Sequence, residues 1–139
     1  MPVSSVYVKV FLIPHSAIDE NGHANNVSFV QWMQDIAVEH YAAIGGIHPM
    51  QLIGASWVVR EHKVEYLLPA FEGQEIEIRT WVENIRRVRS LRKYEFIRKA
   101  DGKTLVRGET DWVFVDSKTG MPRAIPEDVY RVFAVSPND

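Results

Sequence analysis

One long apolar segment with helical spacing, residues 27–44, constrains the fold of this sequence more than any other feature. Its apolar residues recur three or four positions apart and polar residues are few, so we expect a helix that is buried over most of its surface. The pair Gly45-Gly46 follows the segment, and glycine commonly ends a helix. A long helix of this kind needs a large apolar surface to pack against.

Strand patterns dominate the rest of the chain. Residues 6–13 are rich in β-branched and aromatic residues and end at Pro14, which predicts a strand before the helix. Four further strand-like runs follow the helix, at residues 55–70, 74–85, 88–100 and 104–116. Asp101-Gly102 is a hairpin signal between the last two runs. Pro126, at a first helical position ahead of two acidic residues, predicts a short helix near the end.

This order of elements predicts an α+β fold in which one five-stranded antiparallel sheet curls around one central helix. With 139 residues the chain is long enough for a single domain, residues 1–139, with one core. An open sheet of this kind has unpaired edges and one exposed face. We therefore expect two copies of the chain to pair edge to edge.

The composition excludes several classes of protein. Hydrophobic residues make up 46% and charged residues 24%, and the net charge of −2 gives no reason to expect nucleic-acid or membrane partners. The absence of cysteine excludes a disulfide scaffold, a zinc–thiolate site and a cysteine nucleophile. The apolar run at the start is too short for a signal peptide or a membrane span, so we expect a cytoplasmic protein. The five histidines lack metal-ligand spacing, and we expect no metal.

Polar residues crowd into the stretch directly before the long helix, Asp19 to Asn26, which has the sequence DENGHANN. This stretch, together with VEYLLPAFEGQEIEI about forty residues later, resembles the hotdog-fold acyl-CoA thioesterases of the 4-hydroxybenzoyl-CoA thioesterase group. It is also similar to the site of plant-type acyl-ACP thioesterases, Asp-x-Asn-x-His-x-Asn-Asn. The resemblance implies a hotdog fold, hydrolysis of an acyl-CoA or acyl-ACP thioester, no cofactor, and a homodimer or homotetramer.

The resemblance also implies roles for the residues of this stretch. It places the catalytic carboxylate on Asp19, and the N–H group that binds the oxyanion on the backbone of Asn26. A carboxylate can activate water or attack the thioester directly, and N–H groups at a helix N-terminus lack intrahelical acceptors. Asn21 and His23 match the plant-type motif and are assigned to the catalytic group. Gly22 is assigned to substrate binding, where a tight turn brings loop and helix together.

Each of these residues also has a purely structural interpretation. Asp19 can be a turn residue, and Asn25 or Asn26 can cap the helix. His23 can be a buried structural histidine, and Asn21 can occupy a turn position with positive φ. Two pairs of acids are alternative catalysts or plain surface residues: Asp35 and Glu39 on the helix, and Glu61 and Glu65 on the following strand.

A basic run extends from residue 86 to residue 107, with nine lysines and arginines against two acids. One interpretation is a solvated strand face. The other is that Arg86, Arg87 and Arg89 bind the phosphates of coenzyme A or the acidic surface of an acyl carrier protein. Two other functions stay open beside the thioesterase: a hotdog hydratase or dehydratase, and an acyl-CoA-binding protein without catalysis.

Overall fold

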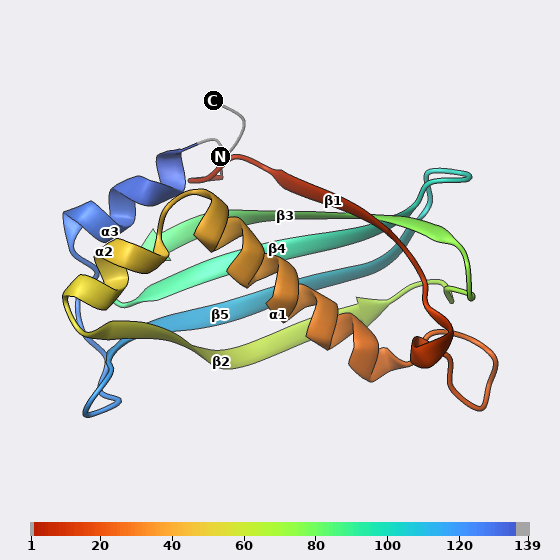
Figure 1. Ribbon diagram of the computed structural model, residues 1–139, viewed down its shortest axis with the longest axis horizontal. Coiled ribbons are helices and arrows are strands. Elements are labelled where there is room, and N and C mark those ends of the chain that lie inside the picture. Colours follow the sequence, from red (N-terminus) through yellow and green to blue (C-terminus); the bar gives the residue numbers. More distant parts are fainter. Residues whose placement is uncertain (1, 136–139) are drawn as a thin grey trace.

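In the computed structural model, which describes residues 2–135, one long helix crosses an antiparallel sheet (Figure 1). The sheet strands are β1 (Tyr7–Leu12), β2 (Ala55–Tyr66), β3 (Glu75–Arg86), β4 (Arg89–Arg98) and β5 (Thr104–Asp116). The helices are α1 (Asn26–Ala43), α2 (Ile47–Leu52) and α3 (Glu127–Arg131), with short 3-10 turns η1 (His15–Ala17) and η2 (Val132–Ala134). Among the described residues, no helix has the length and apolar character needed to cross a membrane.

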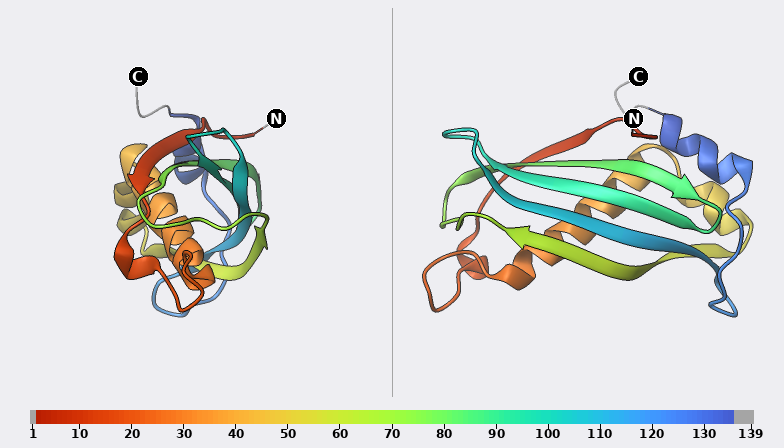
Figure 2. Two further views of the ribbon diagram at one scale, coloured as in Figure 1. Left: turned by 90° about the vertical axis from the view of Figure 1, so that its right-hand side faces the viewer. Right: turned by 180° about the vertical axis from the view of Figure 1, so that it is seen from behind.

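The sheet has the strand order β1-β3-β4-β5-β2, and all neighbouring strands are antiparallel. Figure 2 shows that the sheet curls around α1, with β1 and β2 as its two edges. The predicted α+β hotdog fold is therefore confirmed. Hairpins join β3 to β4 and β4 to β5, and the second turns at Gly102 with a φ of 71°, as the Asp101-Gly102 signal predicts.

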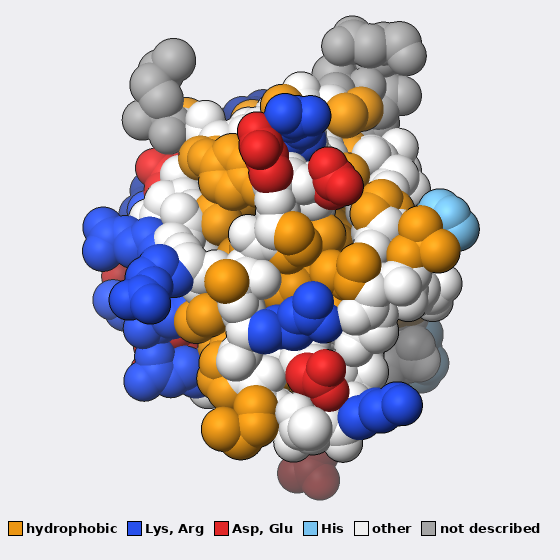
Figure 3. Space-filling model, turned by 90° about the vertical axis from the view of Figure 1, so that its left-hand side faces the viewer, with side chains coloured by type: hydrophobic (Ala, Val, Ile, Leu, Met, Phe, Trp, Pro, Cys, Tyr) orange, Lys and Arg blue, Asp and Glu red, His pale blue; other side chains and the backbone are white. Residues whose placement is uncertain are grey.

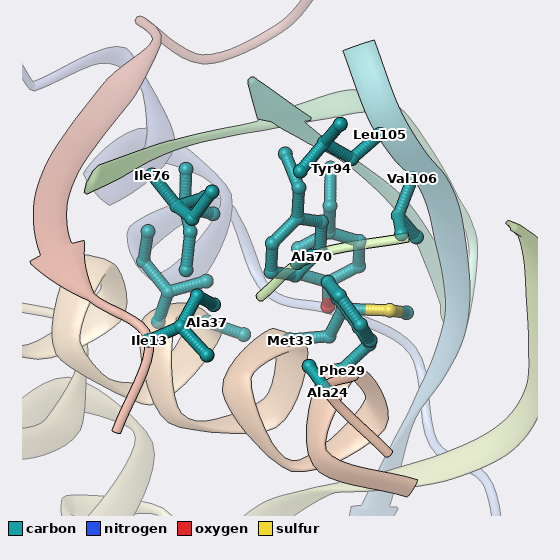
Figure 4. Close-up of a cluster of buried hydrophobic side chains, with 13 residues drawn as sticks. Ile13, Ala24, Phe29, Met33, Ala37, Ala70, Ile76, Tyr94, Leu105 and Val106 are labelled. Carbon is teal, nitrogen blue, oxygen red and sulfur yellow. The ribbon is translucent and has the colours of Figure 1, made fainter. Parts of the chain in front are cut away.

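Buried and exposed residues alternate along the central strands, which shows which side of the sheet faces the helix. In β3, Ile76, Ile78, Thr80 and Val82 are buried, while the residues that alternate with them are more exposed. Figure 4 shows side chains of α1, among them Phe29 and Met33, packed toward those of the sheet. Burial of this apolar face holds the helix across the sheet.

Helix α1 buries one side only. Its buried residues are Phe29, Met33, Ile36, Ala37, His40 and Tyr41. On the other side, Val27 is 72% exposed and Val38 is 57% exposed. The expectation that most of the helix surface is buried is thus wrong within one chain, because the sheet covers a single face and β1 reaches only along its flank (Figure 1).

The elements differ from the sequence prediction most clearly at the end of β2, at α2 and at the start of α3. Strand β2 ends at Tyr66, because the N–H groups of Leu67 and Leu68 both turn to the carbonyl of Leu105. Helix α2 was not predicted; its Pro49 lies in the first turn, where the missing N–H costs no helical hydrogen bond. Pro126 precedes α3 as its N-cap, one position before the predicted one.

Candidate active site

The loop from residue 18 to residue 24 is a tight turn stabilised by its own backbone. Ile18 and Ala24 pair as an antiparallel bridge, and the N–H of Asp19 donates to the carbonyl of His23 at 3.0 Å. The N–H of Gly22 donates to the carbonyl of Asp19 at 3.0 Å. Gly22 has a φ of 84°, a conformation that side-chain-bearing residues rarely adopt, so glycine is required for this turn.

Two backbone hydrogen bonds hold this loop against the rest of the chain. The N–H of Asn25 donates to the carbonyl of Ala17 at 2.8 Å, and the N–H of Ala24 donates to the carbonyl of Ala70 at 2.8 Å. The hydroxyl of Tyr66 adds a third contact, to the carbonyl of Asn26 at 2.8 Å. Loop, helix N-terminus and the segment after β2 therefore form one assembly at one end of the sheet (Figure 1).

Asp19 is partly buried, and its Oδ1 accepts a hydrogen bond from the N–H of Asn21 at 2.9 Å. The structural interpretation of Asp19 as a turn residue is therefore correct. Within residues 2–135 no other hydrogen bond reaches this carboxylate, which leaves Oδ2 available to an external group. The turn contact thus holds the side chain through one of its two carboxylate oxygens.

The N-terminus of α1 offers a hydrogen-bond donor beside this loop. Asn25 is the N-cap: its side-chain oxygen accepts from the N–H of Val27 at 2.9 Å, and its carbonyl accepts from the N–H of Ser28 at 3.0 Å. Asn26 is the first helical residue, and its N–H has no acceptor among the described residues. The helix dipole adds partial positive charge at this point. A free N–H with this environment can bind a developing negative oxygen.

The two remaining residues of the predicted catalytic group lie on the same loop. His23 is partly buried and packs edge-on against Phe71, with ring centroids 6.4 Å apart. Asn21 is exposed and does not have positive φ; Gly22 takes that conformation instead, so the positive-φ interpretation of Asn21 is wrong. Neither side chain hydrogen-bonds to Asp19 in the described chain.

The predicted arginines lie at the opposite end of the sheet. Arg86, Arg87 and Arg89 form the hairpin between β3 and β4, whereas the loop of Asp19 lies near the start of β3 (Figure 1). Since a strand rises roughly 3.3 Å per residue, the length of β3 separates the two regions by roughly 36 Å. Arg89 pairs with Asp111 of β5. One chain therefore does not bring these arginines to Asp19.

Three of the four alternative carboxylates pair with neighbouring side chains. Asp35 accepts from Gln31 on the same helix at 2.8 Å, and Glu39 pairs with Lys9 of β1 at 3.2 Å. Glu65 lies 4.0 Å from Arg107 on the outer side of the sheet, and Glu61 is exposed on the same strand. Among the described residues no group of three histidine or acidic side chains is arranged to hold a metal ion.

The basic run does not form one solvated face, because Arg92 is only 3% exposed. Its Nη1 donates to Nδ1 of His40 at 2.8 Å and to the hydroxyl of Thr80 at 3.2 Å. Sequence reasoning missed this buried arginine. The signal was present: Arg92 occupies an inward position of the alternating strand β4, between Ser90 and Tyr94.

Comparison with known proteins agrees with this architecture. A family model described as the thioesterase-like superfamily matches residues 13–133. No curated protein matches the chain by sequence comparison. Among solved structures, the DHNA-CoA thioesterase of Staphylococcus aureus is 20% identical with a TM-score of 0.81, covering 92% of this chain and 88% of that one.

Two further solved structures are similar to the chain. A hypothetical protein from Staphylococcus aureus in complex with CoA is 14% identical with a TM-score of 0.83, covering 93% of this chain and 82% of that one. The 12:0-ACP thioesterase of Umbellularia californica is 18% identical with a TM-score of 0.84, covering 94% of this chain and 51% of that one. This chain thus spans about half the length of the plant enzyme. At these identities the three structures establish the fold alone.

Proposed function

Because the chain belongs to the thioesterase-like superfamily and is a thioester hydrolase, we propose that it cleaves an acyl-CoA or acyl-ACP thioester to a free carboxylic acid and a thiol. The observation that carries the proposal is the anchoring of the Asp19 loop beside the free N–H of Asn26. Thioester hydrolysis needs a group that delivers a nucleophile and a donor that binds the oxyanion. The loop supplies the first and the helix N-terminus supplies the second.

In this mechanism the substrate carbonyl oxygen binds the N–H of Asn26. Asp19 then removes a proton from the attacking water, or its carboxylate attacks the carbonyl carbon to form a mixed anhydride that water later opens. Either route places negative charge on the carbonyl oxygen, where the helix N-terminus stabilises it. The thiolate leaves and takes up a proton. His23 and Asn21 orient the substrate around this centre, and Gly22 allows the loop its shape.

Coenzyme A is the first choice for the thiol part of the substrate, since two of the similar structures are a CoA thioesterase and a CoA complex. A carrier protein is the second choice, supported by the similarity to the plant acyl-ACP enzyme. Arg86, Arg87 and Arg89 are proposed to bind the phosphates of either carrier. Because these arginines lie at the far end of the sheet from Asp19, this role requires a second subunit whose hairpin reaches the site.

A panel of thioesters tests the proposal directly. Purified protein is incubated with CoA thioesters of short, aromatic and fatty acids and with the corresponding acyl carrier protein thioesters, and free thiol is measured. Thiol release above the uncatalysed rate supports hydrolysis, and the ratio of CoA to carrier-protein rates assigns the carrier. Tight binding without thiol release would instead support the acyl-CoA-binding alternative. Addition of water across an enoyl-CoA double bond would support the hydratase alternative.

A further inference from the structure

A cavity of ≈ 190 Å³ lies between α1, β2 and the inward side of β4 and β5. Its walls are largely apolar and include Tyr41, Ile47, Met50, Trp57, Trp112 and Phe133. Figure 3 faces the end of the molecule that carries α2 and α3, where hydrophobic side chains gather among charged ones. With a helix rise of about 1.5 Å per residue, the cavity begins roughly 16 Å along α1 from Asn26. It is therefore separate from the candidate active site.

A buried positive charge lines this apolar cavity. Arg92 is 3% exposed, and its bonds to His40 and Thr80 use two of the five N–H groups of the guanidinium. Within residues 2–135 no carboxylate lies close enough to pair with it, and its other N–H groups have no acceptor. Burial lowers the pKa of Arg92 to about 10, so the side chain stays charged at neutral pH.

An unpaired buried charge is costly, and apolar side chains in its place are often more stable. The sequence nevertheless has arginine at this inward position. Ser90 lies two residues earlier on the same side of β4, is 3% exposed, and also lines the cavity. Its hydroxyl makes no hydrogen bond among the described residues. The cavity therefore combines an unpaired cation and a free hydroxyl with apolar walls.

We propose that this cavity binds a small apolar carboxylic acid, whose carboxylate is held by Arg92 and Ser90. A guanidinium presents two parallel N–H groups that match the two oxygens of a carboxylate. The volume exceeds the about 150 Å³ of a cavity known to hold benzene, so an acid with one aromatic ring fits. The carboxylate belongs to a free acid, because a one-ring acyl group bound at Asn26 is too short to span the roughly 16 Å to the cavity. Binding of a free acid is independent of the proposed thioesterase activity.

Calorimetric titration with benzoate tests the free acid, with methyl benzoate as the neutral match. The wild-type protein is expected to bind benzoate and to bind the ester at least about tenfold more weakly, since hydrogen bonds to charged groups are the strong ones. Arg92→Met should weaken benzoate binding by a similar factor. The matched control is Lys93→Met, which removes a charge from the next residue of β4, on the outer side of the sheet, and should leave binding unchanged. Equal binding of acid and ester, or benzoate binding unaltered in Arg92→Met, would overturn the proposal.

Urea unfolding distinguishes ligand binding by Arg92 from a purely structural role. If the charge serves a ligand, Arg92→Met should unfold in urea at a midpoint equal to or above that of the wild type, because an unpaired buried charge is lost. If Arg92→Met is instead less stable, Ser90→Ala carries the test, since it keeps the guanidinium and its bonds to His40 and Thr80. Benzoate binding that is weaker in Ser90→Ala supports the site, and unchanged binding in both variants contradicts it.

Hydrolysis of benzoyl-CoA by Arg92→Met separates this site from the proposed active site. Because the cavity lies apart from Asp19 and Asn26, KM for benzoyl-CoA should not depend on Arg92. Benzoate binding, measured by calorimetry, should depend on it. Benzoate binding that does not depend on Arg92 would refute the site. Failure of the thioesterase proposal appears differently, as no hydrolysis of any CoA thioester, and leaves the calorimetric result intact.

Discussion

Arg92 of β4 donates a hydrogen bond of 2.8 Å to Nδ1 of His40 on α1, in the interior between helix and sheet. Arginine has donors only, so this histidine accepts on Nδ1 and carries its proton on Nε2. The ring is fully buried and stacks on Tyr7, with centroids 5.0 Å apart. Burial and the charge of Arg92 lower the pKa of His40 from 6.5 to about 3. His40 is therefore neutral in the folded protein at neutral pH.

This contact predicts a specific acid sensitivity. Between pH 6.5 and about 3 the unfolded chain protonates His40 and the folded chain does not, so the free energy of unfolding decreases as the pH falls through this window. His40→Gln keeps an oxygen that accepts from Arg92 but removes the titrating ring. We expect urea unfolding of this variant to depend less steeply on pH than that of the wild type. His48→Gln, on the surface of α2, is the control; equal slopes in wild type and His40→Gln would refute the prediction.

The N-cap of α1 is expected to matter more for folding than the residue after it. Asn25→Ala removes the oxygen that accepts from Val27, which should lower the free energy of unfolding by about 1 kcal/mol. Asn25→Ser restores an acceptor and should recover most of the loss. Asn26→Ala should change both stability and turnover little, since the proposed oxyanion donor is a backbone N–H that this variant keeps. A larger loss in Asn26→Ala than in Asn25→Ala, measured by urea unfolding, would contradict this assignment.

The exposed edge of β2 predicts association of two chains. Several apolar side chains on or just after this edge strand are exposed: Val58, Tyr66, Leu67, Leu68 and Phe71. Unpaired strand edges and apolar patches of this kind commonly become interfaces. We expect light scattering to give a dimer or tetramer at the concentrations used for assay. A monomer with full activity would show that neither pairing nor a partner's arginines are needed.

The hairpin arginines are expected to affect substrate binding and not the chemical step. Replacing Arg86 and Arg87 together with glutamate should raise KM and leave kcat largely intact, because phosphate contacts are similar in ground and transition states. Lys118→Glu reverses one charge, half of the change in the double variant, on a different exposed turn and is the control. If KM stays unchanged at both low and moderate salt, the arginines serve solubility alone.

The sequence predicts the fold well because each element carries a local signal. The period of residues 27–44 locates α1 within one residue at either end, and the strand-like runs locate all five strands of the sheet. Helix α2 was not predicted because it has only 6 residues, too few to show a helical period, and includes Pro49. The buried contact between Arg92 and His40 was not predicted either, because the two residues lie far apart in sequence and meet only through tertiary packing.

The sequence predicts the loop of the candidate site, but it does not predict which distant residues lie beside that loop in the folded chain. The motif from Asp19 to Asn26 does form a turn against the helix N-terminus, and glycine is required where the sequence has Gly22. Arg86 and Arg87 were predicted to bind the phosphates of the substrate from their charge alone. Charge carries no distance information, so sequence reasoning had no means of locating these residues at the far end of the sheet.

Turnover of an Asp19→Asn variant tests the central claim most directly. The substitution keeps the size of the side chain and the oxygen that accepts from Asn21, but it removes the negative charge. Glu20→Gln, on the exposed neighbouring acid, is the matched control, and Asp35→Asn and Glu39→Gln test the helix carboxylates. All four are compared by circular dichroism and by thiol release from the best substrate of the panel. The account predicts that kcat of Asp19→Asn alone falls by at least about a hundredfold, with its fold intact. Wild-type turnover in Asp19→Asn, together with loss of turnover in Asp35→Asn or Glu39→Gln, would contradict it.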